Sequence, residues 1–190
     1  MNKSKKIGIL SLSLAVVIGA GIPLAHSFGV RVNQTESAPT GIYIVKDLAP
    51  KKGEMIEICP PNVEVIQLMN QRGYMQSGMW GNCEDLGVSP LLKPISALDG
   101  DVVEITPGQP VKVNGIVLPN TQAMSAIPGY PPGKYIVGQN QFWAFSTYNA
   151  GSIDSRYFGP LSIRNIKGNA KPILIKGDIS KVSMGVVSND

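Results

Sequence analysis

The stretch VKVNGIV, residues 111–117, has the pattern of a β-hairpin. Its central Asn-Gly pair can adopt the positive φ angles of a type I′ turn, and apolar residues stand on both sides of it. Outward from this stretch, short apolar runs bounded by Gly, Pro or Asn recur along the chain. They are Ile42–Lys46, Glu54–Ile58, Asp101–Thr106, Lys134–Val137, Phe142–Phe145 and Pro172–Lys176. These runs predict a domain that is mainly β.

The composition agrees with many turns and short strands. Of 190 residues, 21 are Gly and 15 are Pro, and only 16% are charged. This length suffices for one domain with its own core. The net charge of +4 depends on Lys3, Lys5 and Lys6, because the other 14 basic residues (17 less these three) stand against 13 acidic ones. A nearly neutral body predicts no nucleic-acid partner.

One segment departs from the strand pattern. Asn62 follows two prolines, and apolar residues recur at helical spacing from Val63 to Met69, before Gly73. This order predicts a short helix with an Asn cap at its start and a Gly stop at its end.

The predicted helix lies between the two cysteines, Cys59 and Cys83. We therefore interpret residues 59–83 as an insertion on the β framework. In an oxidising compartment the two cysteines are expected to form a disulfide, and the alternative is a pair of buried free thiols.

The N-terminus has the pattern of a membrane signal. Three lysines precede an uncharged, mostly apolar segment at residues 7–30, which is long enough to span a bilayer. We predict that residues 1–6 are cytoplasmic and that residues 7–30 form a single-pass anchor in the lipid of a membrane. Residues 31–178 then form an exported domain, and residues 179–190 form a polar tail. The alternative is a cleaved signal peptide, because Ala25-His26-Ser27 fits a small-x-small cleavage site.

The histidine count limits the chemistry. His26 is the only histidine, and it lies within the apolar segment. A Ser-His-Asp triad or a Cys-His pair in the exported body is therefore excluded. We expect no metal and no other cofactor, because zinc sites draw on several His and Cys and no Asp/Glu loop of the EF-hand kind is present. A hydrolase built from this chain needs a Lys, Asp or Glu base, and a serine with a lysine base meets that need. A carboxylate pair for sugar hydrolysis stays open, although nothing points to one.

Three segments, residues 33–43, 91–103 and 152–160, contain the residues of most chemical interest. They read NQTESAPTGIY, LLKPISALDGDVV and SIDSRYFGP. Their order resembles the signal peptidase I family, which has a serine near a proline after the anchor, a lysine leading a strand that ends in a Gly-Asp turn, and a Ser-x-Asp-Ser-Arg box. The Ser-x-Pro-x-Gly-x-Tyr form of the first segment, and the cysteine pair before the second, are more similar to the conjugative-transfer branch, the TraF-type peptidases. The resemblance covers about residues 30 to 165.

The resemblance implies roles for the central residues. Ser37 is expected to be the nucleophile and Lys93 the general base. A lysine has a pKa near 10.4 and must lose its proton to act, and burial among the apolar neighbours of Lys93 favours that loss. Thr35 is expected to form one arm of an oxyanion hole, with the backbone N–H of Ser37 as the other. The alternatives are a turn serine, a solvated lysine, and a glycosylation sequon at Asn33-Gln34-Thr35.

The third segment is expected to support the site. By resemblance, Ser152 makes a hydrogen bond that orients Lys93. Asp154 and Arg156 are expected to form an ion pair that holds the site in place without taking part in the chemistry. The alternative is a polar loop between strands.

The resemblance implies a signal-peptidase-like coiled β-sheet domain and a serine endopeptidase that processes an exported precursor. It also implies that residues 7–30 anchor the chain in the bacterial inner membrane and that residues 31–178 form a periplasmic domain. The expected substrate is the prepilin of a conjugative transfer (type IV secretion) system, bound as an added strand, with a linear or a cyclic product. The alternatives are a general signal peptidase I and a non-catalytic periplasmic scaffold. The aromatic residues Phe142, Trp143, Phe145 and Tyr148 are expected either to face the membrane or to lie in the core.

Overall fold

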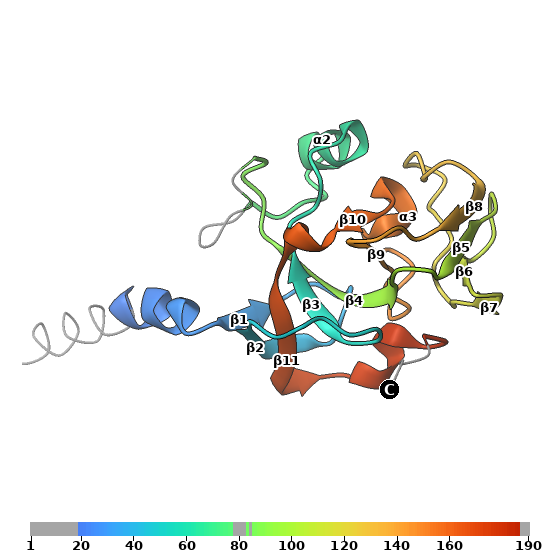
Figure 1. Cartoon of the computed structure of the whole chain (residues 1–190). Coiled ribbons are helices and arrows are strands. Elements are labelled where there is room, and N and C mark those ends of the chain that lie inside the picture. Colours follow the sequence, from blue (N-terminus) through green and yellow to red (C-terminus); the bar gives the residue numbers. More distant parts are fainter. Residues whose placement is uncertain (1–18, 78–82, 84, 187–190) are drawn as a thin grey trace, which may run out of the picture.

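The computed structural model describes residues 19–77, 83 and 85–186. The chain is mainly β, and every strand pairing is antiparallel (Figure 1). The larger sheet has seven strands, in the order β1 (Val30–Asn33), β2 (Thr40–Lys46), β11 (Ile166–Lys176), β3 (Met55–Ile58), β4 (Leu91–Ala97), β9 (Gln141–Ala144) and β10 (Leu161–Ser162). The smaller sheet has four, in the order β7 (Ile116–Val117), β6 (Lys112–Val113), β5 (Val102–Ile105) and β8 (Gly133–Ile136). The mainly β prediction is confirmed.

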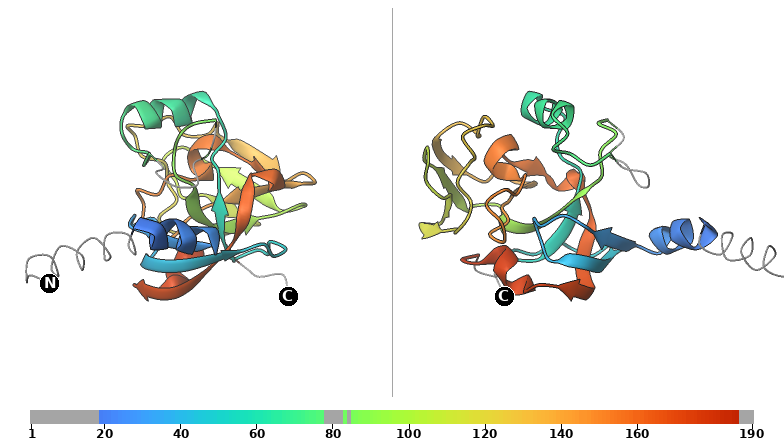
Figure 2. Two further views of the ribbon diagram at one scale, coloured as in Figure 1. Left: turned by 90° about the vertical axis from the view of Figure 1, so that its left-hand side faces the viewer. Right: turned by 180° about the vertical axis from the view of Figure 1, so that it is seen from behind.

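The helical segments within the described residues are short. A helix at residues 19–27 leads into β1, α2 (Glu64–Gln71) lies between β3 and β4, and α3 (Ser155–Phe158) is a single turn. Two 3-10 helices, η1 (Ile163–Asn165) and η2 (Ile179–Ser183), flank β11. The helix at residues 19–27 projects from the end of the body that carries β1, and the smaller sheet lies at the opposite end (Figures 1 and 2).

The six predicted runs all overlap observed strands, and the predicted hairpin is present. Asn114 and Gly115 have φ angles of 51° and 80°, as a type I′ turn requires, and they join β6 to β7. Among the predicted runs, the predicted and observed boundaries differ most at β11, which begins at Ile166 and not at Pro172. Gly168 and Asn169 lie inside this strand, so the bounding residues on which the prediction relied do not mark its start, and its pairing with β2 and with β3 contains irregularities.

The predicted helix is present as α2, and Gly73 follows it with a positive φ of 73°. The predicted cap is wrong. Val63 occupies the N-cap position, and no side chain caps the helix. The Asn62 side chain instead accepts a hydrogen bond from Gln67 Nε2 at 2.8 Å. Asn62 lies one residue before the cap position, where its oxygen reaches a side chain and not a backbone N–H.

The expected anchor at residues 7–30 is only partly covered. Residues 1–18, which include the cytoplasmic segment 1–6, lie outside the described residues. Within the described residues, no helix combines the length and the apolar character needed to cross a bilayer. The last residue of the expected anchor, Val30, belongs to β1 and pairs with Ile44.

Part of the expected tail packs against the body, at Ile179, Val182 and Val186. Val182, in η2, is 1% exposed and contacts the cluster that contains Ala38 and Tyr43. The backbone N–H of Thr147 donates to the carbonyl of Val182 at 3.0 Å. Residues 187–190 lie outside the described residues.

The core has three apolar clusters. One lies between the larger sheet and α2 and includes Ile56, Ile66 and Phe142. A second joins the two sheets around Trp143 and Phe145. Three of the four aromatic side chains that were expected in the core or at the membrane are therefore core residues, because Phe142, Trp143 and Phe145 are at most 1% exposed. Tyr148 is half-buried beside the third cluster.

Candidate active site

The first part of the candidate site is the loop that follows β1. Asn33, the last residue of β1, is buried, and its side-chain amide donates to the carbonyls of Thr35, Ala38 and Pro39 at 3.0, 3.1 and 3.0 Å. Its Oδ1 accepts from the backbone N–H of Thr35 at 3.2 Å. Asn side chains often stabilise turns in this way. One buried amide thus holds the whole loop between β1 and β2.

Ser37 lies in this loop and is half-buried. Its Oγ is 3.2 Å from Thr35 Oγ1, and Thr35 Oγ1 donates to Asn33 Oδ1 at 2.9 Å. Because the Thr35 hydroxyl has one hydrogen and gives it to Asn33, the Ser37 hydroxyl is the donor in its contact with Thr35. The Ser37 carbonyl accepts from Ser146 Oγ at 2.6 Å, which fixes the loop against the chain that follows β9.

Lys93 lies in the middle of β4, opposite Ile56 of β3, and is 1% exposed. Its Nζ donates to Ser152 Oγ at 3.0 Å. Burial lowers the pKa of Lys93 from 10.5 to about 8; the charge of Asp154 raises it, and the charge of Arg156 lowers it. Desolvation disfavours the charged amine more than the carboxylate favours it. A substantial fraction of Lys93 is therefore neutral near pH 8.

Asp154 and Arg156 form a fully buried ion pair behind the lysine. Arg156 Nε and Nη2 donate to the two Asp154 oxygens, both at 2.8 Å. Asp154 also accepts from the backbone N–H of Arg156, which begins the single turn of α3. The remaining guanidinium hydrogens go to backbone carbonyls, including that of Ala150 at 2.9 Å.

Ser146 links this ion pair to the loop that contains Ser37. The N–H of Ser146 donates to Asp154 Oδ2 at 3.0 Å, and its carbonyl accepts from Arg156 Nη2 at 3.0 Å. Its hydroxyl then donates to the Ser37 carbonyl. Ser146 is completely buried, and its bonds to Asp154 and Arg156 are shielded from water.

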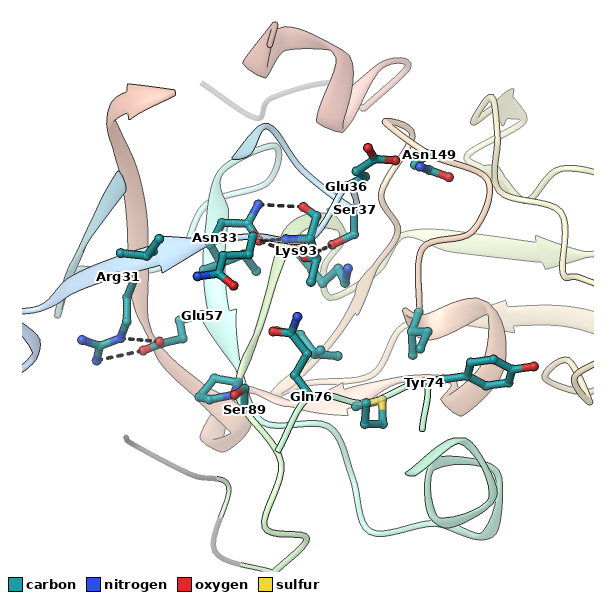
Figure 3. A pocket seen from close by; sticks show the side chains of 18 of the residues that line it. Arg31, Asn33, Glu36, Ser37, Glu57, Tyr74, Gln76, Ser89, Lys93 and Asn149 are labelled. Carbon is teal, nitrogen blue, oxygen red and sulfur yellow. Dashed lines mark hydrogen bonds and ion pairs between the residues drawn. The ribbon is translucent and has the colours of Figure 1, made fainter. Parts of the chain in front are cut away.

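A pocket of about 640 Å³ opens beside these groups. Thr35, Ser37 and Lys93 line it, and Figure 3 shows the Ser37 and Lys93 side chains in the same part of the pocket. Ser152, which accepts from Lys93, is outside the lining, as are Asp154 and Arg156. Among the described residues, no hydrogen bond joins Ser37 Oγ to Lys93 Nζ; each is bonded to another hydroxyl.

One edge of β4 beside the pocket is open. Strand β9 pairs with β4 at Ile95 and Ala97 only, so within the described chain no strand covers the segment Leu91–Lys93 on that side. Such an edge presents backbone donors and acceptors to an extended peptide.

The disulfide prediction is confirmed. Cys59 and Cys83 are bonded, with their Cα atoms 5.5 Å apart. The bond ties the segment after α2 to the end of β3, and residues Tyr74, Met75 and Gln76 of that segment line the pocket. Within the described residues there is no group of three or more His, Cys, Asp and Glu able to hold a metal ion.

Asn33 and Ser146 were not predicted as site residues. Asn33 was available to reasoning from sequence, because an Asn at the end of a strand and before a Thr-x-Ser-x-Pro loop is typical of a turn stabilised by its side chain. Ser146 had no such signal. Its partner Ser37 is 109 residues away in the sequence.

A family model described as signal peptidase, peptidase S26, matches residues 7–175. The chain belongs to this family. Among similar proteins is a plasmid transfer protein TraF of Escherichia coli, 33% identical over 174 residues, which cover 86% of this chain and 96% of the relative. A conjugal transfer protein TraF of Agrobacterium tumefaciens is 31% identical over 166 residues, which cover 84% and 90%.

Among solved structures, a signal peptidase I from Enterococcus faecalis aligns with 65% of this chain and 98% of its own, at 14% identity and a TM-score of 0.38. The resemblance to the TraF-type branch of the signal peptidases, first drawn from three short segments, is thus confirmed along most of the chain by the family match and the TraF relatives.

Proposed function

We propose that this chain is a membrane-anchored serine endopeptidase in which Ser37 is the nucleophile and Lys93 the general base. The observation that carries the proposal is the environment of Lys93. A fully buried amine, with a pKa lowered to about 8 and no carboxylate bonded to it among the described residues, lines the same pocket as the Ser37 hydroxyl. A lysine must be largely neutral to accept a proton from serine, and this environment favours the neutral form.

In the proposed reaction, Ser37 Oγ attacks the carbonyl carbon of the scissile bond and its proton passes to Lys93 Nζ. This step requires the Ser37 hydroxyl to turn from Thr35 toward Lys93 by rotation about its Cα–Cβ bond. Lys93 then gives the proton to the departing amine, which leaves an ester on Ser37. Hydrogen bonds of this kind are often looser before substrate binds.

The negative oxygen of the tetrahedral intermediate needs donors. The backbone N–H of Ser37 has no acceptor among the described residues, so it is free to serve. Thr35 is the proposed second donor, and its hydroxyl must exchange Asn33 Oδ1 for the oxyanion. Removal of one such donor typically lowers the rate by about 10² to 10³. Ser152 orients Lys93, and the Asp154–Arg156 pair holds Ser146 and Ser37 in place.

The proposed substrate is the prepilin of a conjugative transfer system, cleaved after export. The names of the relatives, plasmid and conjugal transfer proteins, support this choice. An extended segment of the precursor would pair with the open edge of β4. Water opening the ester gives a linear product, and an amino group of the same precursor gives a cyclic one. The proposed location is the inner membrane, with the N-terminal segment as anchor and the domain in the periplasm.

The test is processing of a co-expressed prepilin by the wild type, Ser37→Ala and Lys93→Ala, with membrane levels of each variant measured by blot. The proposal expects both variants to accumulate while the precursor stays uncut. Processing by both variants, or none by the wild type, would refute the peptidase and favour a scaffold. The mass of the product distinguishes a linear from a cyclic pilin, because cyclisation removes one water.

A further inference from the structure

The helix at residues 19–27 contributes side chains to the candidate active site. Ile22, Ala25 and His26 of this helix line the same pocket as Ser37 and Lys93. The proposed chemistry uses none of these three helix residues. One wall of the pocket is therefore built from the segment that precedes the β domain.

The turn that follows this helix is attached to β2. The N–H of Gly29 donates to the His26 carbonyl at 2.9 Å, and the Gly29 carbonyl accepts from the N–H of Val45 at 2.8 Å. Gly29 has a positive φ of 84°, and a side chain there would overlap the Val45 carbonyl. Because only glycine allows this close approach, the end of the helix has a fixed place against the sheet.

An ion pair joins the last turn of the helix to a second strand. Arg31 Nε donates to Glu57 Oε1 at 2.6 Å, and Arg31 Nη2 donates to Glu57 Oε2 at 3.3 Å (Figure 3). Arg31 Nη1 donates to the His26 carbonyl at 2.9 Å. Strands β1 and β3, which carry Arg31 and Glu57, are separated in the sheet by β2 and β11. One guanidinium thus joins the helix to a strand with which β1 does not pair.

The burial of this pair favours a role in geometry. The Glu57 side chain is 5% exposed and that of Arg31 is 22% exposed. Such a pair loses hydration energy, so it is weak evidence for a stabilising role. A bidentate contact does fix the orientation of the guanidinium. The direction in which Arg31 holds the His26 carbonyl, and with it the helix, follows from that contact.

Ile22 and Ala25 form an apolar surface of the helix that we call the helix wall. Ile22 is 54% exposed although it lines the pocket, and Leu91 and Leu92 of β4 line the pocket as well. Apolar side chains that face water are stabilised when another apolar group covers them. Because one pocket includes both Ile22 and Ser37, a precursor bound with its scissile bond at Ser37 can reach the helix wall.

We propose that the helix wall binds an apolar segment of the precursor, and that Arg31 and Glu57 are positioning residues that hold this wall at the pocket. The inference rests on the proposed function and adds a specificity determinant to it. A precursor with several apolar residues on one side of the scissile bond would bury them against the wall. A precursor with polar residues there would lose the hydration of its own side chains without gaining a partner.

The test compares two internally quenched peptides with one central Ala–Ala bond, cleaved by the full-length protein in detergent. One peptide has four Leu and the other has four Ser on the same side of the bond, and both sides are tried. We expect the Leu peptide to have a kcat/KM about 10-fold higher for one of the two sides. In Ile22→Ser this preference should fall to about 2-fold, mainly through a higher KM for the Leu peptide.

Leu24→Ser is the matched control. Leu24 belongs to the same helix and is 58% exposed, close to the 54% of Ile22, but it lies outside the pocket lining. Both variants remove a similar apolar area from the helix, so they should change its contact with detergent alike. Leu24→Ser should therefore keep the full preference.

A double variant, Arg31→Gln with Glu57→Gln, tests the positioning role. It removes both charges together and so leaves no unpaired charge in the protein interior. We expect its Leu preference to fall to about 2-fold, as in Ile22→Ser, while its midpoint of urea unfolding stays close to that of the wild type.

The inference fails if neither side of the bond gives a Leu preference, if Ile22→Ser and Leu24→Ser lose it equally, or if the folded double variant keeps it. The proposed function stands in each of these cases, provided that Ser37→Ala is inactive. If Ser37→Ala still cleaves, or the wild type cleaves neither peptide, both fail.

Discussion

Among the described residues two lysines are buried, one in the turn before β3 and one in the neighbouring strand β4, and their partners differ. Lys52, in the turn before β3, is 5% exposed and pairs with Asp101 at 2.8 Å. Lys93, in β4, is 1% exposed and bonds to the hydroxyl of Ser152. Burial is almost equal, so burial alone does not separate a structural lysine from a candidate base.

The two lysines differ in the group to which each is bonded. Asp101 supplies a full negative charge to Lys52, and it also accepts from the backbone N–H of Leu98 and the side chain of Asn114. Burial raises the pKa of Asp101, but the hydrogen bonds from Lys52, Leu98 and Asn114 outweigh this and hold it below its usual value. This cluster joins the turn before β3 to the β6–β7 hairpin. Ser152 supplies no charge, so Lys93 keeps the tendency to lose its proton.

The largest expected effect is from Lys93→Met. If Lys93 is the base, kcat/KM falls about 10⁴-fold or more, measured with a precursor peptide. The same change should stabilise the fold, because a lowering of the pKa from 10.5 to about 8 corresponds to about 3 kcal/mol held in the buried charge below pH 8. In urea unfolding, the gain should be full below pH 8 and vanish as the pH approaches 10.5. A folded Lys93→Met variant with normal activity would show that Lys93 is not the base.

Lys52→Met should have the reverse effect. It leaves the Asp101 carboxylate buried without its counter-charge, so we expect a loss of about 3 kcal/mol in the free energy of unfolding. The activity of the folded fraction should stay within about 2-fold of the wild type, because the cluster lies outside the pocket lining. Unchanged stability in urea would show that hydrogen bonds alone satisfy Asp101.

The pH dependence is expected to follow Lys93. The neutral amine is the active form, so kcat/KM should rise about 10-fold from pH 6 to pH 7 and level off above about 8, where Lys93 loses its proton. Lys52→Met is the control and should keep the same midpoint. A profile that is flat from pH 6 to 9 would remove Lys93 as the base.

The smallest effect is expected at Ser146. Ser146→Ala removes the bond to the Ser37 carbonyl, and we expect kcat to fall about 5-fold with KM unchanged. Ser146→Thr keeps the hydroxyl and should restore most of the rate. Equal loss in both variants, or a change confined to KM, would mean that Ser146 acts on packing and not on the position of Ser37.

Local structure was largely readable in the sequence. The Asn114-Gly115 turn was found because positive φ angles restrict the residue choice, and the strand runs were found because turn residues bound them. The predictions failed where side-chain contacts that the local pattern does not show determine the structure. Asn62 looked like a helix cap by its position, but Gln67 takes its side chain. Val182 lies in the segment that was expected to be a polar tail, and only the tertiary structure shows that it is buried in a core cluster.

By itself, the sequence determined the β architecture and the cysteine pairing, because those depend on turn residues and on the presence of only two cysteines. Ser37 and Lys93 became candidates through the resemblance of their segments to the signal peptidase I family. Only the tertiary structure decided which lysine is buried without a counter-charge, since Asp101 and Ser152 are 49 and 59 residues from their lysines. It also decided that Ser146 holds the Ser37 loop and that Gln76 faces the pocket. The pKa of a side chain and the firmness of a loop depend on what surrounds them, and those neighbours come from distant parts of the chain.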